Sequence, residues 1–182
     1  MKKIPFLFLI IIISSCKGFE GTTSEDVLRV ESKDISIIPK PSELTYSSSS
    51  VTIPRVSSIC YNTAEAGEAA AWLTVLLKRA NLEVEELGGN SCGNWNLTTD
   101  ESLKSSLGEE GYILEIKNEG LFLQAATSAG LFYGIQTIRQ ILPASLESSV
   151  SVSNGIELQQ LYIKDVPRYS WRGTMVDISR SF

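Results

Sequence analysis

The chain has 182 residues, a formal net charge of −5 at pH 7 and a hydrophobic content of 43%, which suffices for the core of one modest domain. The negative charge disfavours nucleic acid as a partner, because nucleic-acid binding depends on neutralising phosphates. The sequence contains no histidine, and this excludes Ser-His-Asp triads, Cys-His dyads and imidazole metal sites within it.

Residues 1–16 have the pattern of a bacterial export signal. Lys2 and Lys3 precede the apolar run 4–13, which is too short to span a bilayer, since a spanning helix needs about 20 residues. Two serines then lead to Cys16 in a pattern that resembles a lipobox. Cleavage before Cys16 and lipidation of its sulfur would anchor an exported lipoprotein to a membrane, in the periplasm or at the cell surface. The alternative is an ordinary secretory peptide with an incidental cysteine.

Residues 17–34 are rich in glycine, serine, threonine and charged residues, and they predict a flexible tether before the folded part. Two further cysteines, Cys60 and Cys92, are too far apart for a CxxC redox or zinc motif. In an exported protein they could form a disulfide, or both could be buried free thiols. The spacing alone does not choose between these alternatives.

Six segments predict strands from their β-branched, aromatic and alternating apolar residues. They are residues 51–53, 56–61, 82–87, 112–117, 121–125 and 156–163. The fourth and fifth flank an Asn-Glu-Gly turn and therefore predict a β-hairpin. Residues 36–46 contain two prolines, which favours a segment at the edge of a sheet. We expect a turn at residues 47–50 and a polar loop over residues 91–101.

Two segments predict helices. Residues 64–80 carry acidic residues in the first turns and basic residues in the last, which complements the helix dipole. The second helix begins after Thr127 or Ser128, either of which can cap it, and ends before Pro143. Each helix has an apolar face at helical spacing, formed by Trp72, Leu73, Leu76, Leu77 and Ala80 in the first and by Leu131, Phe132, Ile135, Ile138 and Leu142 in the second.

The order of these elements predicts an α+β fold over residues 35–163, in which an antiparallel sheet carries both helices on one face. Residues 164–182 continue as a linker and a largely apolar segment, 174–178, which is typical of a strand buried on both faces of a parallel sheet. Such a strand needs a parallel partner that is reached by a long crossover. We therefore expect residues after Val166 to be poorly ordered or loosely docked in isolation.

Three segments, in this order, resemble motifs of one enzyme family. Ile37-Ile-Pro-Lys-Pro41 resembles the opening of the N-terminal domain of bacterial β-N-acetylhexosaminidases. Residues 111–116 and 126–142 resemble the hairpin and the helix of that domain, and residues 165–180 resemble its join to the catalytic barrel. By these motifs the chain resembles glycoside hydrolase family twenty. The resemblance implies a small α/β domain followed by an incomplete first strand of a TIM barrel.

The resemblance also implies an exo-acting glycosidase that removes terminal N-acetylglucosamine or N-acetylgalactosamine from glycans. In the family the acetamido oxygen of the substrate attacks the anomeric carbon, an Asp orients the acetamide, and the neighbouring Glu protonates the leaving oxygen. That Asp-Glu pair belongs to a later barrel strand. No catalytic residue is therefore assigned in this chain, no metal or cofactor is expected, and the chain alone is expected to be inactive.

Arg172 is the functional residue that the family motif transfers to this sequence. It matches the arginine of the Trp-Arg-Gly motif, which in the family binds hydroxyls of the terminal sugar, and a guanidinium can serve two adjacent oxygens. Asp177 and Arg180 match further family positions, which could equally form a structural pair at the end of the strand. The carboxylate pairs at 85–86 and 109–110 are expected to be solvated surface charge.

Two other interpretations are open. The chain could be a non-catalytic exported lipoprotein domain that binds or docks a partner, with Trp95, in the expected polar loop, as the candidate aromatic for stacking on a sugar. Residues 35–163 could also serve only as structural support for the barrel.

Overall fold

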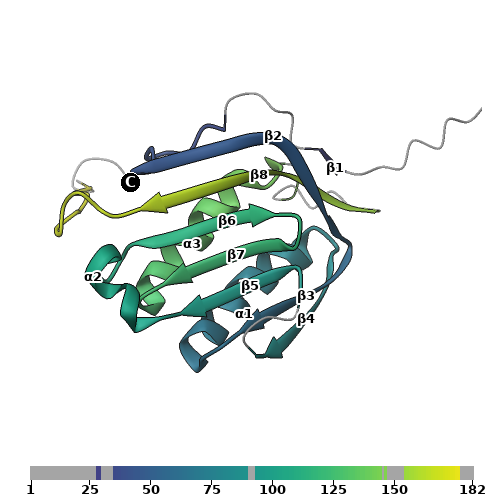
Figure 1. The fold of residues 1–182 in the computed structure, drawn as a ribbon, viewed down its shortest axis with the longest axis horizontal. Coiled ribbons are helices and arrows are strands. Elements are labelled where there is room, and N and C mark those ends of the chain that lie inside the picture. The colour runs from purple at the N-terminus through teal and green to yellow at the C-terminus, as the bar shows by residue number, and fades with distance from the viewer. Residues whose placement is uncertain (1–27, 30–34, 90–92, 145, 147–153, 177–182) are drawn as a thin grey trace, which may run out of the picture.

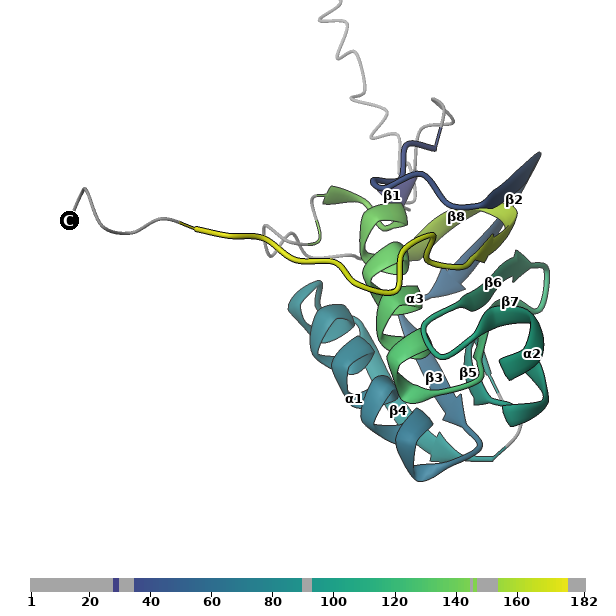
Figure 2. The same ribbon diagram turned by 90° about the vertical axis from the view of Figure 1, so that its left-hand side faces the viewer.

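The computed structural model describes residues 28–29, 35–89, 93–144, 146 and 154–176. A single mixed β-sheet forms one layer of the molecule. Two helices, α1 (Ala64–Arg79) and α3 (Ser128–Ile141), lie side by side on one face of this sheet (Figure 1 and Figure 2). The predicted α+β class, with both helices on one face, is confirmed.

The sheet has the strand order β1-β8-β6-β7-β5-β3-β4, and β2 also pairs with β8. Its strands are β1 (Leu28–Arg29), β2 (Glu43–Pro54), β3 (Val56–Tyr61), β4 (Glu83–Gly88), β5 (Trp95–Thr99), β6 (Tyr112–Lys117), β7 (Gly120–Ala125) and β8 (Gly155–Asp165). The β6–β7 hairpin forms as predicted, with Lys117 opposite Gly120. A short helix, α2 (Lys104–Leu107), lies between β5 and β6 in the chain.

The sheet is antiparallel in one half only, which corrects the prediction of an antiparallel sheet. The pairs β2–β8, β8–β6 and β6–β7 are antiparallel, whereas β7–β5, β5–β3 and β3–β4, and also the short β1–β8 pair, are parallel. The reason lies in the connection through α1. A helix between β3 and β4 returns the chain to the same end of the sheet, so the second strand runs parallel to the first.

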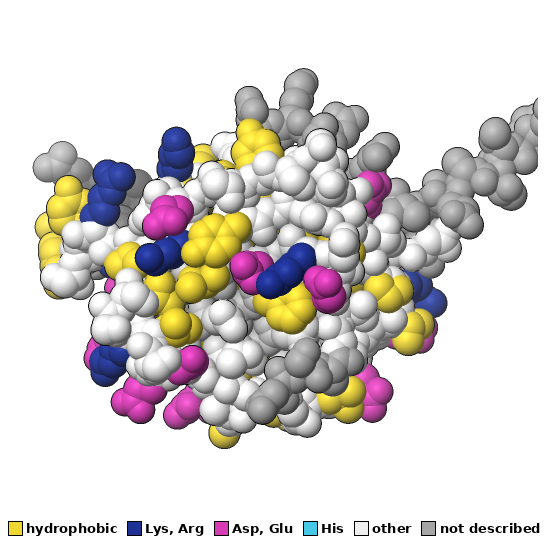
Figure 3. All heavy atoms as spheres, viewed as in Figure 1, with side chains coloured by type: hydrophobic (Ala, Val, Ile, Leu, Met, Phe, Trp, Pro, Cys, Tyr) yellow, Lys and Arg dark blue, Asp and Glu magenta, His cyan; other side chains and the backbone are white. Residues whose placement is uncertain are grey.

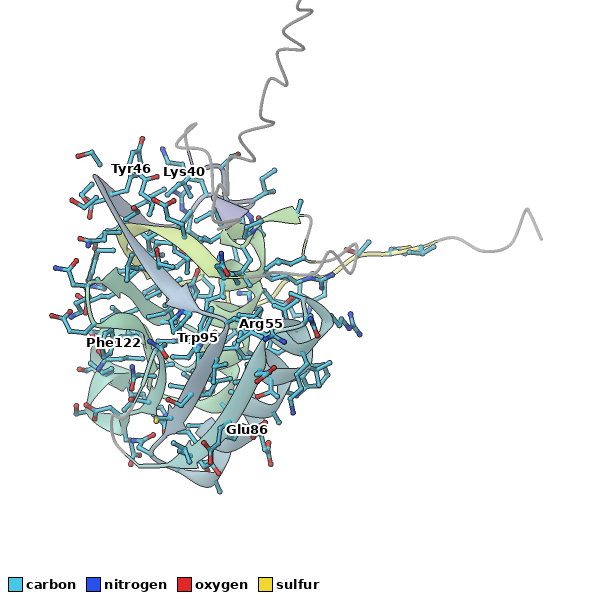
Figure 4. All side chains as sticks on the ribbon, turned by 90° about the vertical axis from the view of Figure 1, so that its right-hand side faces the viewer. Lys40, Tyr46, Arg55, Glu86, Trp95 and Phe122 are labelled. Atoms are coloured by element: carbon cyan, nitrogen blue, oxygen red, sulfur yellow. The ribbon has the colours of Figure 1, made fainter. Side chains whose placement is uncertain are left out.

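The predicted polar loop over residues 91–101 is wrong, because Trp95–Thr99 form β5 in the interior of the sheet. Trp95 is fully buried, and its indole Nε1 donates a hydrogen bond to Ser57 Oγ at 3.2 Å. Figure 4 places Trp95 inside the molecule and Phe122 on the outer side of the sheet. Trp95 therefore fills the core and is not available for stacking on a sugar.

The predicted turn at residues 47–50 is also wrong. These serines belong to β2, and the pairing of β2 with β8 shifts its register between Tyr46 and Ser50. A shift of this kind marks a β-bulge, which bends a strand without ending it. The strand therefore continues through the serines, and their side chains stay exposed.

Helix α1 is capped by Thr63, whose hydroxyl accepts a hydrogen bond from the Ala66 amide at 3.2 Å. Its buried face consists mainly of small residues and leucines, which are Ala66, Ala69, Ala70, Leu73 and Leu77. The assignment of Trp72 to this face is wrong, because its side chain is 66% exposed, and Phe132 of α3 is likewise 44% exposed. Neighbouring helical positions differ by about 100° around the axis, so Trp72 points outward where Leu73 points inward.

Helix α3 is capped by Thr127, whose hydroxyl accepts a hydrogen bond from the Gly130 amide at 3.4 Å. Two of its glycines face the sheet, one turn apart. A Cβ on Gly130 would lie 2.4 Å from the carbonyl oxygen of Gly111, and a Cβ on Gly134 would lie 2.2 Å from Leu123 Cδ1. Glycine at these two positions therefore allows the helix to lie close to the sheet, against β6 and β7.

The predicted lipidation site, Cys16, and the export signal at 1–16 lie outside the described residues. The predicted tether also lies outside them, except that Leu28–Arg29 pair with β8 as β1. Cys60 is disulfide-bonded, so the alternative of a buried free thiol is wrong for this residue, and its partner lies outside the described residues. Within the described part of the chain, no helix is long and apolar enough to cross a membrane.

Residues 166–176 follow β8 as a linker without helix or strand. Of the predicted strand 174–178, residues 174–176 are described and are not in a strand, and the remaining two lie outside the described residues. Trp171 and Met175 expose most of their side chains. The linker passes α3 and leaves the domain on the helix side of the sheet (Figure 2).

Candidate functional site

A cleft of about 690 Å³ opens where the linker begins. Its lining comes from residues 37–42, from Glu110 and Tyr112 at the start of β6, from α3 and from residues 165–172. The first and last of these segments meet because β2 and β8 are paired, with Glu43 opposite Lys164, and so both segments leave the sheet at the same end. The three segments that carry the family motifs are therefore brought together around one cleft.

Hydrogen bonds to distant elements hold the segment 37–42 in place. The side-chain amide of Gln140, on α3, accepts a hydrogen bond from the Ile38 amide at 2.9 Å and donates one to the Ile38 carbonyl at 3.0 Å. The amide and hydroxyl of Ser42 donate to Asp165 Oδ1 at 2.9 and 3.0 Å. These contacts fasten the segment to both α3 and the end of β8, so this wall of the cleft has a defined backbone position.

Arg172, the sugar-binding residue predicted from the family motif, lines the same cleft. Its Nη2 donates hydrogen bonds to Glu110 Oε2 at 2.7 Å and to the Tyr133 hydroxyl at 3.3 Å. Its Nη1 donates to the carbonyl of Tyr169 at 2.6 Å. The guanidinium also lies over the Tyr133 ring, with its central carbon 5.5 Å from the ring centroid. An ion pair and a cation–π contact thus act on the same cation.

The contacts of Arg172 favour its charged form. The hydrogen bond to Glu110, and then the one to Tyr133, raise the pKa of Arg172 above its ordinary value. A guanidinium is already protonated at any physiological pH, so these contacts orient the group and do not change its charge. Elsewhere in the lining, burial raises the pKa of Tyr112 to about 12, and its hydroxyl lies 2.5 Å from Thr137 Oγ1. The cleft therefore combines a permanent cation with a neutral tyrosine.

Glu110 and Tyr133 are the partners of Arg172 that sequence reasoning missed. The prediction of solvated surface charge at 109–110 fits Glu109, which pairs with Lys104 at 3.2 Å, but Glu110 pairs with Arg172 at 2.7 Å. Glu110 lies 62 residues from Arg172 in the sequence, and Tyr133 lies 39 residues from it. No local pattern links positions so far apart, so only the fold brings them together.

Binding oxygen atoms is the chemistry that this arrangement allows. The donors of a guanidinium lie in one plane, a geometry that suits two neighbouring hydroxyl oxygens. In this structure Glu110, Tyr133 and Tyr169 occupy these donors, so a sugar would have to replace some of them. Asp177 and Arg180 lie outside the described residues. Within the described ranges, acidic residues and cysteines form no group of three that could hold a metal ion.

The fold is the α+β domain found in β-hexosaminidases of known structure. A mutant Streptomyces plicatus β-hexosaminidase, solved in complex with GlcNAc, matches with a TM-score of 0.71 and 31% sequence identity, over 82% of this chain and 29% of that chain. The β-N-acetylhexosaminidase from Streptomyces coelicolor matches with a TM-score of 0.66 and 32% identity, over 78% of this chain and 28% of that chain.

Sequence comparison identifies the family. The family model for glycosyl hydrolase family 20, domain 2, matches residues 34–166. A β-hexosaminidase of Porphyromonas gingivalis is 32% identical over 185 residues, which cover 100% of this chain and 24% of that protein. The chain belongs to glycosyl hydrolase family 20. It spans a quarter or less of the length of the P. gingivalis protein and of two further relatives, from Vibrio harveyi and Bifidobacterium bifidum.

Proposed function

We propose that this chain is the N-terminal part of an exo-β-N-acetylhexosaminidase. The enzyme would hydrolyse terminal N-acetylglucosamine or N-acetylgalactosamine by substrate-assisted, retaining catalysis. The family match and the names of the relatives support this substrate class. The catalytic Asp-Glu pair of the family is not assigned to any of these residues, so the chain by itself is proposed to be inactive.

One observation carries this proposal, and it is the position of Arg172. The residue follows the family-matched segment 34–166 directly, within the motif Pro167-Arg-Tyr-Ser-Trp-Arg-Gly173. Its proposed role is to donate hydrogen bonds to hydroxyls of the terminal sugar and thereby to orient the ring for attack by the acetamido oxygen. The attacking oxygen would come from the substrate, and the Asp that orients the acetamide and the Glu that protonates the leaving oxygen would come from the rest of the enzyme.

A chimera tests this function. In it, the present chain replaces the matching segment of the P. gingivalis β-hexosaminidase. We expect the chimera, but not the 182-residue chain, to hydrolyse a chromogenic N-acetylglucosaminide. In the chimera, Arg172→Ala should lower kcat/KM by about tenfold to a hundredfold, because hydrogen bonds to a charged group contribute about 1.5–3 kcal/mol.

Arg55→Ala is the matched control for this experiment, since it removes an arginine that lies outside the cleft and pairs with Glu83 at 2.8 Å. It should leave kcat/KM almost unchanged. Hydrolysis by the 182-residue chain alone, or an Arg172→Ala chimera with unchanged kcat/KM, would contradict the proposal.

We further propose that the protein is exported and carries a lipid on Cys16, which anchors it to a membrane. The lipobox-like sequence before Cys16 supports this. The wild-type protein should fractionate with bacterial membranes and show the mass of a lipidated N-terminal cysteine, whereas Cys16→Ser should remain in the soluble fraction. Ser14→Ala serves as the control and should fractionate like the wild type. Membrane association that survives Cys16→Ser with an unchanged mass would rule out this anchor.

A further inference from the structure

The face of the sheet opposite the helices carries a shallow groove of about 360 Å³. It is lined by residues 45–47 of β2, 115–117 of β6 and 160–162 of β8, and we call it the sheet-face groove. Figure 3 looks onto this face and shows basic and acidic side chains interspersed among apolar ones. The linker leaves the domain on the helix side and does not cover this face (Figure 2). The volume is within the range of about 300–1,000 Å³ that is usual for small-molecule sites.

Tyr162 supplies an aromatic ring to the groove. Strand pairing places Tyr162 opposite Glu115 of β6, and Glu115 in turn opposite Phe122 of β7. Paired residues point to the same face of a sheet, and Phe122 lies on the outer side (Figure 4), so Tyr162 lies there too. The face of an aromatic ring is negatively polarised and packs favourably on the C–H groups of a sugar ring. Strand β8 therefore provides the stacking aromatic that the sequence suggested at Trp95.

The charges beside Tyr162 cancel in pairs. Glu115 pairs with Lys117 at 2.6 Å, and Glu43 pairs with Lys164 at 3.8 Å. Burial, and then the charges of Glu43 and Glu115, raise the pKa of Tyr162 above its ordinary value, so the phenol keeps its proton at neutral pH. A groove in which each of these carboxylates already has a lysine partner favours a neutral ligand over an ionic one.

Two side-chain amides add directional hydrogen bonding. Gln160 Nε2 donates a hydrogen bond to Asn118 Oδ1 at 2.6 Å. Each amide has one oxygen and one nitrogen, so this bond leaves Gln160 Oε1 as an acceptor and Asn118 Nδ2 as a donor for a ligand. An acetamido group carries one N–H donor and one carbonyl acceptor, which match this pair in number and kind. A sugar with an acetamido substituent therefore suits both the aromatic and the amide part of the groove.

We propose that the sheet-face groove binds a neutral, N-acetylated saccharide. The sugar ring stacks on Tyr162, and the acetamido group hydrogen-bonds to the Gln160–Asn118 pair. This goes beyond the proposed function, in which the sugar is held by Arg172. The groove is shallow and buries only part of a ligand, so the expected dissociation constant is millimolar. Such a site would keep a glycan at high local concentration around the protein.

An NMR titration of the 182-residue chain with N,N′-diacetylchitobiose tests the site. The backbone amide signals of Glu115, Lys117 and Tyr162 should shift. Cellobiose is the comparison ligand, because it carries hydroxyls where N,N′-diacetylchitobiose carries acetamido groups. We expect N,N′-diacetylchitobiose to bind about tenfold more tightly than cellobiose, since cellobiose leaves the amide pair without its partner.

Three variants locate the binding. Tyr162→Ala should weaken the binding of N,N′-diacetylchitobiose about tenfold through the loss of stacking. Gln160→Ala should weaken it several-fold and reduce the preference over cellobiose. Arg172→Ala is the matched control and should leave the dissociation constant unchanged, because Arg172 lines the other cleft.

Hydroxyl-radical footprinting gives a reading on the wild type that does not depend on a variant folding. Tyr162 should oxidise several-fold more slowly when N,N′-diacetylchitobiose is saturating. Trp72, which is 66% exposed on the opposite side of the domain, is the internal control and should oxidise at the same rate with and without the sugar.

The outcomes separate this inference from the proposed function. Binding that is lost in Arg172→Ala but kept in Tyr162→Ala would overturn the sheet-face groove and leave the role of Arg172 standing. Equal affinity for the two disaccharides, or no binding of N,N′-diacetylchitobiose, would also overturn it. A dimer in sedimentation in which Tyr162 is protected without sugar would overturn it too, because a second copy would then occupy the groove.

Discussion

Arg172 and Glu110 form an ion pair with 2.7 Å between Nη2 and Oε2, and this pair joins the linker to the segment just before β6. The two side chains are 40% and 36% exposed. Exposed pairs of this kind contribute only about 0–1 kcal/mol to the free energy of unfolding. The pair therefore sets where the linker lies and has little influence on whether the domain folds.

Glu110→Gln removes the charge on one side of this pair. We expect amide hydrogen exchange over residues 168–176 to become several-fold faster, while the free energy of unfolding changes by less than about 1 kcal/mol. Added salt should have the same effect on the wild type, because it screens exposed charges. Glu109→Gln is the matched control, since Glu109 pairs with Lys104 and not with the linker. Equal exchange rates in the two variants would show that Glu110 does not hold the linker.

Trp95 and Trp72 provide a test of the core. Trp95 is fully buried, so Trp95→Ala should lower the free energy of unfolding by about 3–5 kcal/mol through lost contacts and a cavity. Trp72→Ala should change it by no more than about 0.5 kcal/mol, because that side chain is largely exposed in this chain. Urea unfolding of both variants measures the difference. A greater loss from Trp72→Ala would place the wrong tryptophan in the core.

The close approach of α3 to the sheet predicts a penalty for adding a methyl group at Gly130. Gly130→Ala should destabilise the protein by about 1–3 kcal/mol, because the new Cβ meets the Gly111 backbone and backbone yields less easily than a side chain. Gly67→Ala in α1 is the control. Its Cβ would lie 3.1 Å from the Tyr61 ring, which can shift, and alanine is the better helix former by about 1 kcal/mol. If Gly130→Ala and Gly67→Ala lowered the free energy of unfolding by similar amounts, α3 would not lie unusually close to the sheet.

Tyr112 predicts a loss of stability at alkaline pH. Burial raises its pKa to about 12 in the folded protein, from the ordinary value of 10.0. Between these two values the unfolded chain loses the phenolic proton before the folded protein does, so the free energy of unfolding should fall as the pH rises from about 10 to about 12. In Tyr112→Phe this part of the fall should be absent. Urea unfolding of both proteins across this pH range measures it, and parallel curves would contradict the assignment.

Periodicity and capping residues predicted the two long helices and where they begin. Both features depend on residues that lie only a few positions apart in the sequence. Thr127 as the cap of α3 is one example, and the β6–β7 hairpin around Asn118-Glu119 is another. The same local rules misplaced Trp72 and Trp95. Whether Trp72 lies on the buried face of its helix or beside it depends on what packs against that helix. Whether Trp95 lies in a loop or in a short inner strand depends in the same way on the neighbouring strands.

The family motifs identified Arg172 from the sequence, but its surroundings followed only from the fold. The described parts of the motif segments, residues 37–41, helix α3 and residues 165–172, meet at one cleft because β2 pairs with β8 and α3 lies beside their ends. Glu110 and Tyr133 could not be predicted as partners of Arg172, since their contacts cross 62 and 39 residues of sequence.

The sequence by itself determined the α+β class, the family resemblance and the choice of Arg172 as the candidate sugar-binding residue, because composition, periodicity and short motifs are local properties of the chain. The tertiary structure decided the mixed direction of the sheet, the burial of Trp95, the exposure of Trp72 and Phe132 and the contacts of Arg172. Each of these depends on which segments face one another after the chain has crossed over, and packing between distant residues sets that arrangement.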